Sequence, residues 1–464
     1  MRKKEEPALP GPSRLLRSLT SYGGRVVSSL GLRGVGMGLQ FAISVLSARL
    51  LGVEGFGTYT YAFVWVTVLG AVAQLGFGAL AAREMPGRVA RGDGEGARLY
   101  LRFAGAATAV TVAGMAALLA AAQAAGAAVP FGWALLALGI GLQAGGTLVG
   151  GALAGMQRIV ISQMIEVTLR PAIMFAGLTA LGVLAAASGA GVGARDVYLL
   201  AIGASGATLV AAAAMLRRAL AGDLPAPARS GAGADAPGGE RAPLRAWTLG
   251  ALALLATSIT TMMMTNLDIL MIGAMAPIEE VGRYRAASRG VDVILIASGV
   301  AVQVMGPMLA RALAEGRAEE SRGLIARAAA TMAAVGLPLC LALMIGAEAY
   351  LALFGAEFVP AAPAMRILVA GQVVAILCGP AGMTLIMMRR ERMVLALNLA
   401  ALAANLGLNL LLIPVYGLEG AAIATLVSVA GVRIAMAVVL RRGGHDPTAA
   451  APVRAAWRRL RRRP

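Results

Sequence analysis

Charged and amide side chains recur at helical spacing inside long apolar stretches of this 464-residue chain. In the first stretch Gln40 follows Arg33 by seven residues, which places both side chains on one face of a helix. Guanidinium groups hold phosphate through forked donors. Ten such residues are predicted to line one binding cavity: Arg33, Gln40, Glu166, Arg170, Asp268, Arg289, Asp292, Gln303, Asn398 and Asn405.

Each polar group also has a purely structural interpretation. Glu166 and Arg170 are four residues apart and Arg289 and Asp292 three apart, so each pair can neutralise itself. The stripes that contain Thr257, Thr261 and Thr265, or Asn405 and Asn409, can instead form hydrogen bonds between helices. Arg33 has no acid within one helical turn, so it needs a partner from elsewhere in the fold.

The residues of the sequence offer little support for metal binding or for nucleophilic catalysis. The chain has one histidine, His445, in a basic tail, and its two cysteines, Cys340 and Cys378, lie in apolar stretches. No metal cluster and no Ser-His-Asp set can be drawn from these residues. We expect a protein that is not an enzyme and that holds no metal or cofactor.

The elements that position these residues follow from composition. Hydrophobic residues make up 59% of the chain and charged residues 14%, and the mean hydropathy is +0.77. Soluble domains carry roughly 25% charged residues. Apolar stretches long enough to cross a bilayer lie between short charged clusters, and the alternation typical of a β-barrel is missing. The sequence therefore predicts an all-α, polytopic membrane protein.

We expect about twelve transmembrane helices in two six-helix bundles. The N-terminal bundle covers residues 26–216 and the C-terminal bundle 246–440. A linker at 217–245 joins them, a short segment at 1–25 precedes them, and a basic tail at 441–464 follows. The spans are expected at 26–50, 58–82, 101–123, 132–155, 159–186, 196–216, 246–274, 284–310, 324–346, 363–388, 394–414 and 418–440.

Arginines alternate from one side of the predicted membrane to the other. They gather at residues 2–25, 83–102, 158, 217–245, 311–327, 389–392 and 441–463, all on one side. The opposite breaks hold few, mainly Arg195, Arg283 and Arg285. By the positive-inside rule both termini are cytoplasmic. The net charge of +18 therefore reports topology rather than nucleic-acid binding, although the tail can also contact anionic membrane lipids.

A short motif appears at the same place in both halves. Gly57-Thr58-Tyr59 follows the first predicted span and Gly282-Arg283-Tyr284 follows the seventh. Six spans is an even number, so the two halves have the same orientation. They would then be related by a pseudo-twofold axis along the membrane normal, with the transport path between them.

Longer segments resemble a known family. LSARLLGVEGFGTYTYAF and AQLGFGALAAREM near the start are similar to the Wzx-type flippases of lipid-linked oligosaccharides, which are polysaccharide biosynthesis proteins of the multidrug/oligosaccharidyl-lipid/polysaccharide exporter superfamily. LDILMIGAMAPIEEVGRYRAASRGVDVI in the centre resembles the same family. So do FGAEFVPAAPAMRILVAGQ and RRERMVLALNLAALAANLGLNLLLIPVYGLEGAAIAT in the C-terminal half. The resemblance runs from about residue 25 to 440 and implies a V-shaped pair of bundles that opens alternately to each side.

The resemblance implies a flippase that moves polyprenyl-diphosphate-linked oligosaccharide to the outer leaflet of the bacterial plasma membrane. Coupling to the membrane potential, H⁺ or Na⁺ is an option, and candidate partners are polysaccharide polymerase and assembly proteins. Three alternatives stay open: an exporter of drugs or small cations, a membrane glycan polymerase or ligase, and a structural assembly protein. The related lipid II flippases carry functional arginines on their first and eighth helices, where Arg33 and Arg289 lie here.

Overall fold

The computed structural model of the protein describes residues 12–223 and 244–448. Within these ranges all regular structure is helical. The side chains of residues 12–33, 159, 223, 296–298 and 300–304 are not described, so the predictions for Arg33 and Gln303 lie outside the described residues. The predicted all-α class is confirmed.

The first six spans form the N-terminal bundle. Its first helix contains two spans, because α1 continues through a break at Gly52, and its fifth span is made of three joined helical segments. The elements are α1 (Pro12–Ala73), α2 (Phe77–Ala90), α3 (Gly94–Ala124), α4 (Trp133–Gly155), α5 (Ile159–Gln163), the π-helix η1 (Met164–Leu169), α6 (Arg170–Ser188) and α7 (Ala194–Asp223).

The next six spans form the C-terminal bundle. Its last helix again contains two spans, and α14 breaks at Gly417. The elements are α8 (Leu244–Met275), α9 (Ile278–Ala314), α10 (Ala318–Ile345), α11 (Ala347–Ala352), the 3₁₀-helix η2 (Ala356–Ala361), α12 (Ala362–Leu377), α13 (Ala381–Met387) and α14 (Glu391–Arg442).

Nine helices of the described chain are long and apolar enough to cross a membrane, and α1 and α14 are two of them. These two long helices account for two of the three predicted spans without a membrane-length helix of their own; the third, 284–310, lies in α9, which is not among the nine. Gly52 and Gly417 have φ of 67° and 52°, in the left-handed region that glycine adopts without a steric penalty. Each glycine reverses the chain with almost no loop, so two neighbouring spans form one long helical element with a sharp turn inside it. The helix of α1 also begins at Pro12, earlier than the span expected from residue 26.

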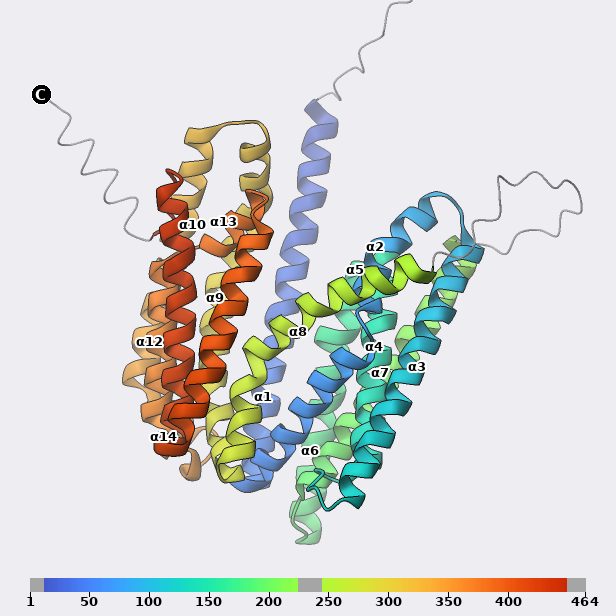
Figure 1. The fold of residues 1–464 in the computed structure, drawn as a ribbon, viewed down its shortest axis with the longest axis vertical. Coiled ribbons are helices and arrows are strands. Elements are labelled where there is room, and N and C mark those ends of the chain that lie inside the picture. Colours follow the sequence, from blue (N-terminus) through green and yellow to red (C-terminus); the bar gives the residue numbers. More distant parts are fainter. Residues whose placement is uncertain (1–11, 224–243, 449–464) are drawn as a thin grey trace, which may run out of the picture.

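The bundles form a V (Figure 1). They meet at the lower end of the view, which we call the closed end, and diverge toward the upper end, which we call the open end and where α14 finishes. Two hydrogen bonds link α1 with the C-terminal bundle at the closed end. Arg49 donates to the Leu353 carbonyl at 2.7 Å, and the Val53 N–H donates to the Glu357 carboxylate at 3.1 Å. Within the C-terminal bundle, Arg283 of α9 donates to the Glu357 carbonyl of η2 at 3.1 Å.

The repeated Gly-x-Tyr motifs meet each other at this closed end. A Cβ on Gly57 would lie 2.1 Å from the Ile278 carbonyl oxygen, and one on Gly282 would lie 2.4 Å from the Val53 carbonyl oxygen. Each Cβ would also lie 3.2 Å from the amide nitrogen of the other glycine. The two backbones therefore touch, and the motif repeats because each half supplies one glycine to the crossing.

A second junction ties the start of α8 to the N-terminal bundle. The Trp247 ring packs edge-on against Tyr100 at 5.1 Å, and the Arg88 guanidinium lies 5.1 Å from the Trp247 ring. Arg88 also pairs with Asp93 at 2.7 Å. As a result α8 crosses from one bundle to the other (Figure 1).

Candidate functional site

A cavity of about 290 Å³ lies between the bundles, next to the closed end. We call it the central cavity. Residues of α1, α4, η1, α6, α7 and α9 line it, so both bundles contribute. Its polar lining consists of Gln40, Ser44, Ser47, Tyr59, Thr60, Thr67, Gln143, Glu166, Arg170, Arg285 and Arg289.

Three arginines line the central cavity, and several of their N–H groups have no hydrogen-bond partner among the described residues. Arg170 donates to the Gln143 side-chain carbonyl at 3.2 Å and lies over the Phe63 ring at 5.7 Å. Arg289 pairs with Asp292 at 3.1 Å, but its Nε is buried and has no partner among the described residues. The guanidinium of Arg285 forms no hydrogen bond or ion pair with any described residue. Half-buried cations with unpaired donors attract an anion.

The structural interpretation of Glu166 and Arg170 as a self-neutralising pair is wrong, because the two side chains form no ion pair among the described residues. Glu166 lies in η1, a π-helical turn that ends at Arg170. Pro171 follows directly and lacks the N–H that would bond to the Val167 carbonyl, which favours such a turn. Glu166 is therefore exposed, and Arg170 bonds to α4 instead.

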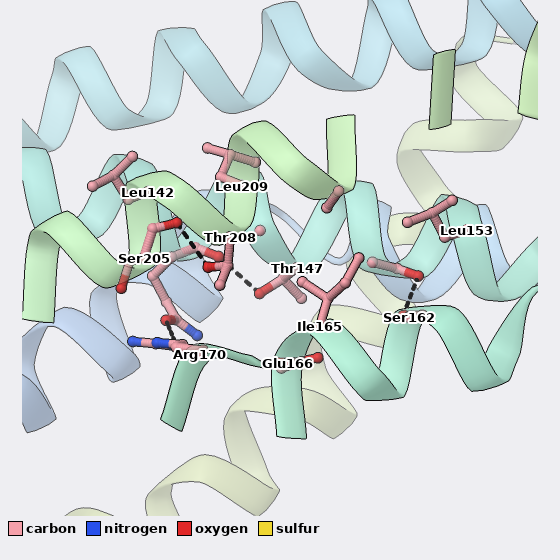
Figure 2. A pocket seen from close by; sticks show the side chains of 14 residues that line it. Leu142, Thr147, Leu153, Ser162, Ile165, Glu166, Arg170, Ser205, Thr208 and Leu209 are labelled. Atoms are coloured by element: carbon pink, nitrogen blue, oxygen red, sulfur yellow. Dashed lines mark hydrogen bonds between the residues drawn. The ribbon is translucent and has the colours of Figure 1, made fainter. Parts of the chain in front are cut away.

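A small side pocket of about 50 Å³ opens beside Arg170 and Glu166 (Figure 2). Its hydroxyl groups donate to helix carbonyls: Ser205 to Ala201 at 2.7 Å and Thr147 to Gln143 at 2.9 Å. The oxygen lone pairs therefore face the pocket as acceptors. The volume is enough for a few water molecules. The central cavity thus has a polar recess inside the N-terminal bundle that is large enough for water.

The C-terminal bundle contains its own cavity of about 540 Å³, which we call the C-bundle cavity. At one end the Asp268 carboxylate accepts three hydrogen bonds, from Tyr284 at 2.6 Å, from Asn409 at 2.8 Å and from Thr425. Asn405 connects to this cluster through Asn409 at 3.0 Å. The interhelical hydrogen bonds considered for the asparagine stripe are therefore formed.

A third cavity of about 260 Å³ lies between α1 and α9. Met37, Phe41 and Leu295 make it mostly apolar, and Gln40 and Arg289 connect it to the central cavity. We call it the α1–α9 gap. An apolar opening directly beside a polar cavity suits an amphipathic ligand.

The structure distributes the predicted residues over these cavities. Gln40, Glu166, Arg170 and Arg289 line the central cavity. Asp268 and Asn398 line the C-bundle cavity, Asp292 lines that cavity and the α1–α9 gap, and Asn405 is buried in the hydrogen-bond cluster. Thr261 and Thr265 line the C-bundle cavity, whereas Thr257 is not among its lining residues.

The sequence interpretation missed four important residues. Arg285 was placed in a basic break on the opposite side, but it lies in α9 one helical turn before Arg289 and lines both main cavities. Arg285 lies four residues before Arg289, and this spacing, which places both side chains on one helix face, could have identified it. Gln143, Tyr59 and Arg433 carried no comparable signal, because the cavities that they line are formed by several helices.

Comparisons with known proteins agree with this architecture. The sequence profile of a family described as polysaccharide biosynthesis protein matches residues 25–313. The match begins where the resemblance was expected to begin, and the similar segments at 354–372 and 389–425 lie beyond it. No curated protein sequence matches significantly.

Solved structures share the fold across most of the chain. An inward-facing multidrug resistance MATE transporter of the MOP superfamily is 14% identical with a TM-score of 0.66, covering 90% of this chain and 97% of its own. The lipid II flippase MurJ in an inward closed conformation is 12% identical with a TM-score of 0.66, covering 89% and 87%. A MOP superfamily transporter from Pyrococcus furiosus, whose binding pocket has reverse polarity, is 17% identical with a TM-score of 0.55, covering 90% and 94%.

Proposed function

Because the chain belongs to the polysaccharide biosynthesis protein family, we propose that it flips polyprenyl-diphosphate-linked oligosaccharide units between membrane leaflets. One structure of the same fold is named a lipid II flippase, which supports a lipid-linked cargo. The observation that carries the proposal is the convergence of Arg170, Arg285 and Arg289 on one cavity between the two bundles.

The arginines suit the diphosphate of such a cargo. Each guanidinium offers planar, forked donors that match phosphate oxygens, and it keeps its charge at any physiological pH. Arg285 has all its donors free among the described residues, and Arg289 has its Nε free. A bound diphosphate would supply the anion that these cations lack.

The two other parts of the cargo also find suitable surroundings. The glycan needs a polar route, since unpaired hydroxyl groups cost several kcal/mol in hydrocarbon. The central cavity and its side pocket offer amide, carboxylate and hydroxyl partners. The polyprenyl tail can lie in the apolar α1–α9 gap while its diphosphate reaches Arg289.

We place the protein in the bacterial plasma membrane with both termini in the cytoplasm, as the arginine distribution favours. The closed end then faces outward and the open end faces the cytoplasm, where the cargo is made. An inside-negative potential drives each negative charge outward by about 2.3 kcal/mol per 100 mV. Polymerase and assembly proteins that consume the flipped unit are the expected partners.

A coupling cation would find its ligands at Asp268. The carboxylate, the Thr425 hydroxyl and the buried, unpaired Asn409 side-chain oxygen are the hard oxygen donors that Na⁺ prefers, and the carboxylate alone can carry a proton. Among the described residues no group of three His, Cys, Asp or Glu side chains could hold a metal ion. We propose the potential as the main driving force, with Asp268 as an optional cation site.

The alternative functions fit this site less well. An exporter of cationic drugs would favour an acidic cavity, whereas the central cavity holds three arginines against Glu166. A polymerase or ligase would favour a substantial outer loop, and the segment around α11 and η2 is short and packs against the bundles. We therefore propose transport without covalent chemistry.

The test uses cells that need this gene in order to make their surface polysaccharide. Deletion should cause lipid-linked oligosaccharide to accumulate facing the cytoplasm and should abolish surface polymer. Arg285→Gln and Arg289→Gln should each reproduce this loss at equal protein level, while Arg392→Gln, at an exposed arginine outside the cavities, should not. Outward-facing units that are not polymerised would refute the flippase proposal, and so would wild-type polymer in both cavity variants.

A further inference from the structure

Arg433 is a half-buried cation that the proposed transport cycle has not used. It lies in the second half of α14, nine residues before the helix ends at Arg442, so it is about 14 Å along the axis from that end. Its guanidinium approaches Gly382 of α13 and faces the C-bundle cavity. It forms no hydrogen bond or ion pair with any described residue.

The C-bundle cavity connects Arg433 with the arginines of the central cavity. Arg285 lines both cavities, and Asp292 lines the C-bundle cavity and the α1–α9 gap. Thr425, beside Asp268, precedes Arg433 by eight residues on the same helix, which is about 12 Å along its axis. A ligand that binds Arg285 can therefore extend along α14 toward Arg433.

Neither acid of this cavity forms an ion pair with Arg433. Asp292 is paired with Arg289 at 3.1 Å, and the Asp268 carboxylate accepts hydrogen bonds from Tyr284, Asn409 and Thr425. A guanidinium keeps its proton under all physiological conditions, so Arg433 presents a permanent positive charge to the cavity. A ligand with a negative charge at this place would pair with it.

We propose that Arg433 binds a sugar carboxylate on the glycan of the cargo, so that the protein selects acidic over neutral oligosaccharides. The inference rests on the proposed flippase function, with the diphosphate at Arg285 and Arg289 and the outer part of the glycan reaching from the central cavity into the C-bundle cavity. A carboxylate matches the guanidinium fork with two parallel hydrogen bonds. Asn398 and Gln372 line the same cavity and offer amide groups to neighbouring hydroxyls.

The test measures binding to the purified full-length protein. Two probes are compared, a short polyprenyl diphosphate that carries a neutral N-acetylhexosamine disaccharide, and the same molecule with a uronic acid as its outer sugar. Wild-type protein should bind the acidic probe at least tenfold more tightly. Arg433→Gln should bring the two affinities close together without changing that for the neutral probe. Arg433→Lys should retain part of the preference, because lysine is a point charge without the fork.

Each outcome decides between the proposals. Equal wild-type affinity for both probes would overturn the assignment of Arg433 while leaving the flippase proposal intact. If Arg433→Gln binds both probes equally more weakly at an unchanged melting temperature, then Arg433 maintains the shape of the cavity and does not bind the sugar carboxylate. Failure of the wild-type protein to bind either probe would refute the flippase proposal and this inference with it. Arg392→Gln, at an exposed arginine, should match the wild type throughout.

Discussion

Replacing Gly57 with alanine should push the closed end open. The new Cβ would lie 2.1 Å from the Ile278 carbonyl oxygen, and ordinary contact begins at 3.4 Å, so the backbones must separate by more than 1 Å. Both neighbouring groups are backbone and cannot rotate away. Overpacking of this kind costs about 1–3 kcal/mol. A state in which the bundles have separated there avoids the cost, so the ratio of closed to open should fall by about 5- to 150-fold.

Pulsed electron paramagnetic resonance can measure this shift directly. Spin labels at Glu54 and Ala274, both exposed near the closed end, would report the distance between the two halves. The two native cysteines are buried and would first be replaced. Gly57→Ala should add a population at longer distance that is small or absent without the substitution.

A matched glycine separates the steric effect from the helix preference of alanine. Gly114 lies in α3, and a Cβ at this position would meet nothing within 4 Å, so Gly114→Ala should leave the distance distribution unchanged. An unchanged distribution in Gly57→Ala would show that the backbones do not meet at this glycine. An equal shift in both variants would show that helix propensity, rather than contact, sets the equilibrium.

Three further predictions concern the junctions and the buried cluster. Glu357→Ala removes the acceptor for the Val53 N–H at the break in α1, so the same labels should report a shift in the direction of Gly57→Ala but smaller, from a cap worth about 0.5–2 kcal/mol; no shift would count against this contact. Arg88→Ala removes an ion pair and a contact with Trp247, and it should lower the melting temperature in detergent, with Arg88→Lys intermediate; equal melting of all three proteins would contradict this. Asn409→Leu leaves the half-buried Asp268 carboxylate without one donor and should cost about 1–3 kcal/mol of stability, so an unchanged melting temperature would refute the cluster.

Much of the fold was predictable, because hydropathy and glycine act locally. Apolar length identified the spans, and the breaks at Gly52 and Gly417 fall between spans that the sequence separated. The Gly-x-Tyr repeat was visible as a motif, and its contact at Gly57 and Gly282 gives the repeat a physical reason. The merging of two spans into one helix was not visible, since it depends on φ angles at single residues.

The candidate site was predictable in part. Polar stripes identified Gln40, Arg170 and Arg289, since a polar side chain inside an apolar helix is costly unless it faces a cavity. The Glu166–Arg170 ion pair that the spacing allowed is not formed, because Arg170 donates to Gln143 of α4 instead. The ion pair of Arg289 with Asp292 formed as its spacing allowed.

The sequence by itself determined the membrane class, the two-bundle organisation and the supply of arginines, because these depend on composition and on periodicity within single helices. Only the tertiary structure decided which arginines share a cavity. Arg170 and Arg285 come from different bundles, and the partners of Asp268 come from α9 and both halves of α14. The crossing of helices far apart in the chain sets these contacts, and no local pattern records where two helices cross.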